Sequence, residues 1–219
     1  RGRAESSRVS TNGALAIILH TCEFPDGNWW AKVITKKAIE ALGDNDLVGV
    51  LLYGTTGNKG NQWGDDWLFR LQPARNRVAL GRMVERCEPM DMPAFDPTVK
   101  KAVEGLRGVK ASMKHIIIIS DGDPAPPSPQ TQQALRSGRD ITLSAIAIGS
   151  HSTQNILKPL AEQCGGRFYN VTDPKKLPQI FIKETMIVKR SLFFEHEFTP
   201  QVASPADEFL GPLVNCKPP

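Results

Sequence analysis

Short, wholly apolar runs alternate along the chain with longer stretches in which apolar residues recur at helical spacing. The clearest run is residues 116–119, four consecutive isoleucines, which is typical of a strand buried on both faces of a parallel sheet. Glycine and proline residues mark the ends of several segments. The pattern predicts strands at 14–20, 46–53, 66–71, 115–120, 141–148 and 167–171, and helices at 28–42, 76–87, 98–106, 129–137, 153–163 and 174–188.

This alternation of strands and helices predicts an α/β fold: a Rossmann-like, doubly wound, mostly parallel sheet with helices on both faces. The glycine-rich stretch 54–64 leads into an expected strand rather than a helix, so we interpret it as a hairpin connection to one antiparallel edge strand and not as a phosphate-binding loop. After the first strand no glycine occurs until Gly27, which excludes the dinucleotide-binding G-x-G-x-x-G motif.

Composition and charge narrow the choice of partners. The net charge of +4 comes from lysines and arginines that are spread along the 219 residues, so no nucleic-acid partner is expected. No apolar run approaches the roughly 18–20 residues that cross a bilayer, so this fragment itself is not expected to insert in a membrane. The four cysteines form no C-x-x-C pair and are expected to be free thiols; they are Cys22, Cys87, Cys164 and Cys216.

The composition also divides the chain into three segments. Residues 1–12 are polar and charged and are expected to form a disordered lead-in. Residues 13–190 hold the α/β pattern. Residues 191–219 are rich in proline and lack a helical period, so they are expected to be a C-terminal extension or linker. We interpret the chain as a fragment of a longer protein.

Three segments together resemble the von Willebrand factor A domain family. They are DLVGVLLYG, HIIIISDGDP and LSAIAIGSHSTQNILKPLAEQCGGRFYNVTDPKKLPQIF, and in this order and spacing the resemblance extends over about residues 13–188. SDGDPAPPS, GGRFYNVTDPKKLPQIFIKE and VKRSLFFEHEFTP resemble a bacterial subgroup of large membrane-anchored proteins, in which the domain lies beside one similar to glutamine amidotransferases. The resemblance implies a membrane-anchored bacterial parent, with the side of the membrane open.

Domains of this family usually bind a divalent cation through an Asp-x-Ser-x-Ser run after the first strand, a later Thr, and an Asp after the fourth strand. By position, the first Asp falls on His20, the serines on Cys22 and Phe24, and the Thr near residues 92–93, while the last Asp is retained as Asp121. Mg²⁺ prefers oxygen ligands, so the resemblance implies that this metal-ion-dependent adhesion site is degenerate and that no metal or other cofactor is bound.

Two main interpretations of the altered rim remain open, beside small-molecule binding in the crevice and an acidic turn at Asp121 that binds a cation or a basic group of a partner. In the first, His20 and Cys22 cap the sheet and have a structural role, and the acidic turn at Asp121 is an ordinary turn. In the second, one divalent metal, zinc or magnesium, is bound by His20, Cys22 and Asp121, with Glu23 or Asp123 as a fourth ligand. These five residues are the candidate rim of the crevice.

The leading functional hypothesis is a non-catalytic protein-interaction module whose partners include the neighbouring domain of its parent chain. A metal-binding domain with a His/Cys/Asp shell is the second hypothesis, and an enzyme acting at the crevice is the third. No catalytic set is predicted, because His115 leads into a buried strand and Ser120 lacks the G-x-S-x-G context of a nucleophile. Of Trp29 and Trp30, one is expected in the core and the other could face a partner.

Overall fold

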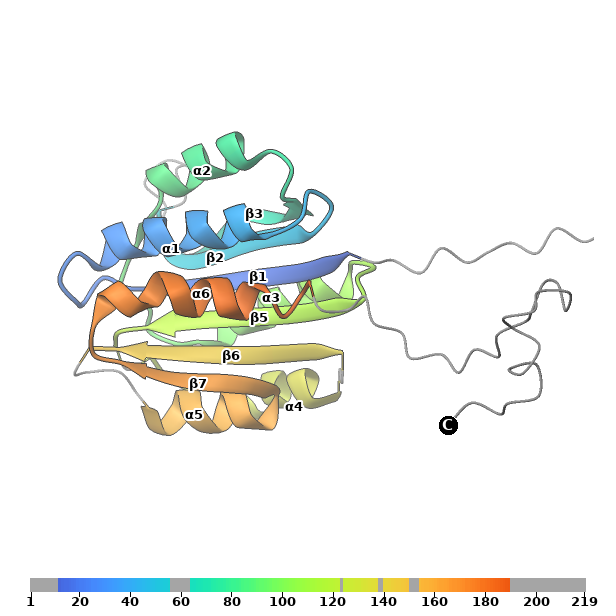
Figure 1. Ribbon diagram of the computed structural model, residues 1–219. Coiled ribbons are helices and arrows are strands. Elements are labelled where there is room, and N and C mark those ends of the chain that lie inside the picture. Colours follow the sequence, from blue (N-terminus) through green and yellow to red (C-terminus); the bar gives the residue numbers. More distant parts are fainter. Residues whose placement is uncertain (1–11, 56–63, 123, 138–139, 150–153, 190–219) are drawn as a thin grey trace, which may run out of the picture.

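The computed structural model describes residues 12–55, 64–122, 124–137, 140–149 and 154–189. Its centre is a sheet in the order β3-β2-β1-β5-β6-β7 (Figure 1). Five strands run parallel: β1 (Gly13–His20), β2 (Leu47–Thr55), β5 (Met113–Ser120), β6 (Ile141–Ile148) and β7 (Gly165–Val171). Strand β3 (Gly64–Pro73) pairs antiparallel with β2 at one edge. The predicted fold class is therefore confirmed.

Helices cover both faces of the sheet (Figure 1). On one face lie α1 (Gly27–Ala41), α2 (Arg77–Arg86) and α6 (Leu177–Thr185); on the other lie α3 (Asp96–Arg107), α4 (Pro129–Ser137) and α5 (Gln154–Gln163). Alternate residues of the central strands enter two separate cores, so that Ile17 and Ile117 pack on the first face and Ile18 and Ile116 on the second. This explains why the central strands are apolar at every position.

Two short elements were not predicted. Strand β4 (Glu88–Pro89) pairs antiparallel with the end of β2, and a 3₁₀ turn, η1 (Pro174–Lys176), precedes α6. Strand β7 also begins at Gly165, which sequence reasoning assigned to a helix stop; its φ of 67° is in the left-handed region that favours glycine. No helix among the described residues is both long and apolar enough to cross a bilayer.

A buried polar network joins α6 to three strands near their amino-terminal ends. Glu184 of α6 accepts hydrogen bonds from Arg167 Nε (2.8 Å) and from the Tyr169 hydroxyl, and its second oxygen lies 3.4 Å from His115 Nε2. His115 Nδ1 lies 2.7 Å from Thr142 Oγ1. Burial raises the pKa of Glu184, but contacts with His115, Ser144 and Tyr169 outweigh it and hold the pKa at about 2. His115 is therefore part of a buried polar network and not of a catalytic set.

Replacing Glu184 with Gln is expected to lower the free energy of unfolding at pH 7 by about 3 kcal/mol, the equivalent of a pKa moved from its ordinary value to about 2. A lowered carboxyl pKa stabilises the fold above pH 4.5, and the effect is lost as the pH falls through 2. The deficit of Glu184→Gln should therefore shrink by about 2 kcal/mol at pH 3. Urea unfolding at pH 7 and pH 3 measures the deficit, with the exposed Glu162→Gln as control. An equal deficit at the two pH values would contradict a stabilising role for the ionised Glu184 carboxylate.

Candidate functional site at the carboxyl ends of the strands

The site begins with the pairing of β1 and β5. These neighbouring parallel strands pair in register with His20 beside Ser120, so both end at the same edge of the sheet. Asp121 follows directly, and its backbone N–H donates to the His20 carbonyl (3.2 Å). Ligand sites in open α/β sheets lie outside the carboxyl ends of the strands, and the site occupies that place.

His20 is completely buried and its ring is held from both sides. Nδ1 lies 2.9 Å from the Ser120 hydroxyl oxygen. Nε2 lies 3.5 Å from an Asp91 oxygen and 3.8 Å from Asp121 Oδ1. Ser120 thus orients the imidazole so that its other nitrogen faces carboxylates.

Asp121 is only 1% exposed, and its two oxygens have different surroundings. Oδ2 accepts hydrogen bonds from the backbone N–H groups of Glu23 (2.5 Å) and Phe24 (2.9 Å), which fixes the turn after β1. Oδ1 makes no hydrogen bond within the described part of the chain. Burial raises the pKa of Asp121 to about 6; the two backbone donors oppose this rise and the charge of Glu23 adds to it.

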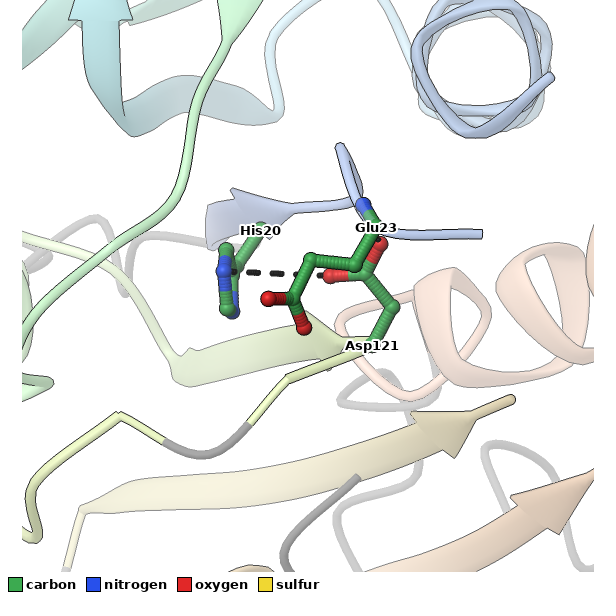
Figure 2. A group of neighbouring side chains, drawn as sticks. All are labelled: His20, Glu23 and Asp121. Atoms are coloured by element: carbon green, nitrogen blue, oxygen red, sulfur yellow. Dashed lines mark hydrogen bonds and ion pairs between the residues drawn. The ribbon is translucent and has the colours of Figure 1, made fainter. Parts of the chain in front are cut away.

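His20, Glu23 and Asp121 converge into one group (Figure 2). One ligand atom from each, an imidazole nitrogen or a carboxylate oxygen, lies within 4.8 Å of the others. Gly122 permits this approach, because a Cβ at that position would lie 2.3 Å from Glu23 Oε2 and 2.7 Å from His20 Cε1. Nitrogen and oxygen ligands of this kind suit zinc, so the group could hold a divalent metal.

The structure brings together only part of the predicted rim. Cys22, expected to join His20 and Asp121, lies outside the group and is exposed, because the turn directs Glu23 toward Asp121 instead. Partial burial of its sulfur, together with the charges of Asp121, Asp91 and Glu23, raises the pKa of the Cys22 thiol to about 11. A thiol protonated at neutral pH is a poor metal ligand. Asp123 lies outside the described residues.

Asp91 is the rim residue that sequence reasoning missed. The family's Thr was placed near residues 92–93, but Met92 is buried and the side chain beside His20 is that of Asp91, which is 76% exposed. Strand β4 brings this segment to the rim by pairing with the end of β2. The sequence did offer a signal for Asp91, because an acidic residue lies directly before the position where the family's Thr was expected.

The two neighbouring tryptophans at the start of α1 have different roles. Trp30 packs against the core, whereas Trp29 is 57% exposed. Their rings meet edge to face with centroids 4.7 Å apart. The exposed Trp29 indole, packed against a partly buried neighbour, offers apolar contact area in the first turn of α1, which follows the turn that carries Glu23.

Comparisons with known proteins agree with the fold. Residues 31–170 match the family model described as von Willebrand factor type A domain. A von Willebrand factor type A protein from Catenulispora acidiphila is 21% identical, with a TM-score of 0.67, over 82% of this chain and 42% of that one. An aerotolerance-related membrane protein from Bacteroides fragilis is 12% identical, with a TM-score of 0.58, over 78% of this chain and 96% of that one.

A further similar structure is proximal thread matrix protein 1 from the mussel byssus, described with a zinc-occupied MIDAS motif. It is 14% identical, with a TM-score of 0.63, over 82% of this chain and 46% of that one. The chain thus spans less than half of the length of the Catenulispora and mussel proteins. No curated protein sequence matches it significantly.

Replacing Asp121 with Asn is expected to stabilise the metal-free protein at pH 7. The raised pKa of Asp121 makes the fold more stable below pH 4, and this contribution is lost as the pH rises through about 6. It amounts to at most about 3 kcal/mol, the equivalent of a pKa raised from 3.8 to about 6. Urea unfolding in EDTA between pH 4 and pH 8 should show this fall in the wild type and in Glu162→Gln, but not in Asp121→Asn. An Asn variant with an unchanged pH profile would contradict the assignment.

Proposed function

Because this chain belongs to the von Willebrand factor type A domain family, we propose that it is a non-catalytic protein-interaction module of a larger, membrane-associated bacterial protein. Its contact surface is the rim at the carboxyl ends of the strands, which works without the Mg²⁺ usual for the family. The observation that carries this proposal is the exposed Trp29 beside the rim, since a rigid, half-exposed tryptophan is a typical anchor of protein interfaces.

The position of the chain ends supports the same surface. Val188, which follows α6, packs directly on Gly13, the first residue of β1, at the amino-terminal edge of the sheet. Both ends of the described domain therefore lie at the edge opposite the rim (Figure 1). Neighbouring parts of a longer chain would attach there and leave the rim accessible.

A catalytic role is less well supported, although Ser120, His20 and Asp121 lie together. The Ser120 hydroxyl contacts the imidazole, as a nucleophile contacts its base. However, Ser120 and His20 are completely buried, which leaves a substrate no access to the Ser120 hydroxyl. The hydroxyl also donates to the Gly122 carbonyl (3.5 Å), in keeping with a role in orienting the ring.

The second candidate function is metal binding by the altered shell, with Glu23 in the place expected for Cys22. The convergence of His20, Glu23 and Asp121 favours it, as does the Asp121 oxygen that lacks a hydrogen bond. A zinc ion there would tie the turn after β1 to the end of β5. The similar mussel protein supports zinc as the metal to test.

Photo-crosslinking tests the interaction surface. With p-benzoylphenylalanine in place of Trp29, irradiation of membranes from the source bacterium should give a specific protein adduct. The matched control is Val78, which is 68% exposed on α2 near the opposite edge, and it should not give this adduct. Equal labelling from both positions, or labelling from Val78 alone, would show that the rim is not the contact surface.

Metal titration separates the two candidates. Magnesium or manganese at about 1 mM should leave the melting temperature unchanged, because the first candidate binds neither metal. A metal that bound only the folded state would raise the melting temperature by mass action. A rise with magnesium that Asp121→Ala abolishes would show that the usual metal site works. Purified protein carrying close to one equivalent of zinc, lost in Glu23→Gln but retained in Cys22→Ser, would establish the second candidate instead.

A further inference from the structure

The charged groups that act on the rim all have the same sign. The charges that raise the pKa of the Cys22 thiol are those of Asp121, Asp91 and Glu23, all carboxylates. Among the largest causes of the pKa shifts of Cys22 and Asp121, every charged group is a carboxylate. Elsewhere on the described surface, several acidic side chains are paired with basic ones, as in Lys37 with Glu40 and Arg77 with Asp44. The rim is therefore a local concentration of negative charge on a chain whose net charge is +4.

A second, independent feature points into this cluster. Asp121 is 1% exposed, yet its Oδ1 makes no hydrogen bond within the described segments and faces Glu23 and His20. A buried carboxylate oxygen without a donor costs free energy, and a donor that carries a positive charge recovers the most. The exposed Glu23 converges on the same position, and the exposed Asp91 lies on the other side of the imidazole, 3.5 Å from His20 Nε2. Two carboxylates thus meet at a position where Asp121 Oδ1 has no hydrogen-bond donor among the described residues, with a third carboxylate nearby.

From these contacts we infer that the rim binds a basic side chain, an arginine or lysine of the protein partner. This inference rests on the proposed interaction function and names the chemistry of the contact. A guanidinium or ammonium group supplies several N–H donors, which can bond Asp121 Oδ1 and the Glu23 carboxylate, while the Asp91 carboxylate adds to the negative charge around it. A domain with a bound metal attracts a carboxylate of its partner, whereas here the carboxylates belong to the domain. The preferred charge of the partner is therefore inverted.

The turn between β1 and α1 makes binding at Asp121 detectable by NMR. The backbone N–H groups of Glu23 and Phe24 donate to Asp121 Oδ2, so a cation at Oδ1 of the same carboxylate changes the environment of both amides. Trp29 lies in the first turn of the helix that follows and adds apolar area for the rest of the partner. The cation contributes specificity and the tryptophan contributes buried area, as at other interfaces.

An NMR titration of the 219-residue chain in EDTA tests the inference. The probe is Nα-acetylarginine amide, and the matched control probe is Nα-acetylcitrulline amide, which has nearly the same shape without the charge. The arginine probe should shift the Glu23 and Phe24 amides with a Kd in the millimolar range, and citrulline should bind at least about tenfold more weakly. Amides of the buried strand β5 should not move.

Variants locate the contact. Asp121→Asn should weaken binding of the arginine probe at least about fivefold and the exposed Asp91→Asn about twofold, while the remote Glu162→Gln should leave it unchanged. If Asp121→Asn does not fold, Asp91→Asn and Glu23→Gln still decide the matter. The inference is overturned if arginine and citrulline bind equally, if neither shifts these amides at about 50 mM, if Nα-acetylglutamate amide shifts them instead, or if the rim variants bind like the wild type.

The outcome also separates this inference from the proposed function. A protein adduct from the Trp29 position together with no arginine binding would leave the interaction module standing and remove the basic side chain as its target. Arginine binding without any adduct would remove the interaction function and leave a cation site. One equivalent of zinc bound at His20, Glu23 and Asp121 would likewise overturn the inference, because the metal would occupy the position assigned to the basic side chain.

Discussion

The in-register pairing of β1 with β5 is the constraint on which the rest of this domain depends. It buries alternate residues of both strands in two separate cores, and it ends both strands at His20 and Ser120. The carboxylate of Asp121 then accepts hydrogen bonds from the turn after β1. The residue that follows β5 therefore fixes the direction in which the chain leaves β1. A change of register by one residue would exchange the two faces of each strand and separate these groups.

The position of Asp121 combines a structural role with a charge that is expensive to bury. One oxygen is satisfied by two backbone donors and keeps the turn in place, while the other is left beside Glu23 and His20. Glu184 differs in its electrostatics: its carboxylate is equally buried, but Arg167 and Tyr169 of β7 donate to one oxygen, the other lies near His115, and its pKa is lowered instead of raised. The lowered pKa of Glu184 means that its charge stabilises the fold at neutral pH, whereas the raised pKa of Asp121 means that its charge costs free energy there. A buried charge kept at such a cost is more typical of a functional group.

The fold was predictable from the sequence because the signals that specify it are local. Uninterrupted apolar runs such as residues 116–119 require burial on both faces, and helical periods lie between them. The rim was predictable only in part. His20 ends one strand and Asp121 follows another, so their convergence could be foreseen, whereas the roles of Glu23 and Cys22 depend on which way a tight turn directs each side chain. Asp91 reaches the rim through the two-residue strand β4, which no periodicity reveals.

The contact of Val188 with Gly13 has a mechanical consequence. Where the two ends of a domain are adjacent, a pull on the flanking segments would act first on the contact between the start of β1 and the end of α6. That contact lies at the edge of the sheet opposite the rim, so such a pull would enter the domain at the far ends of the strands that carry the rim.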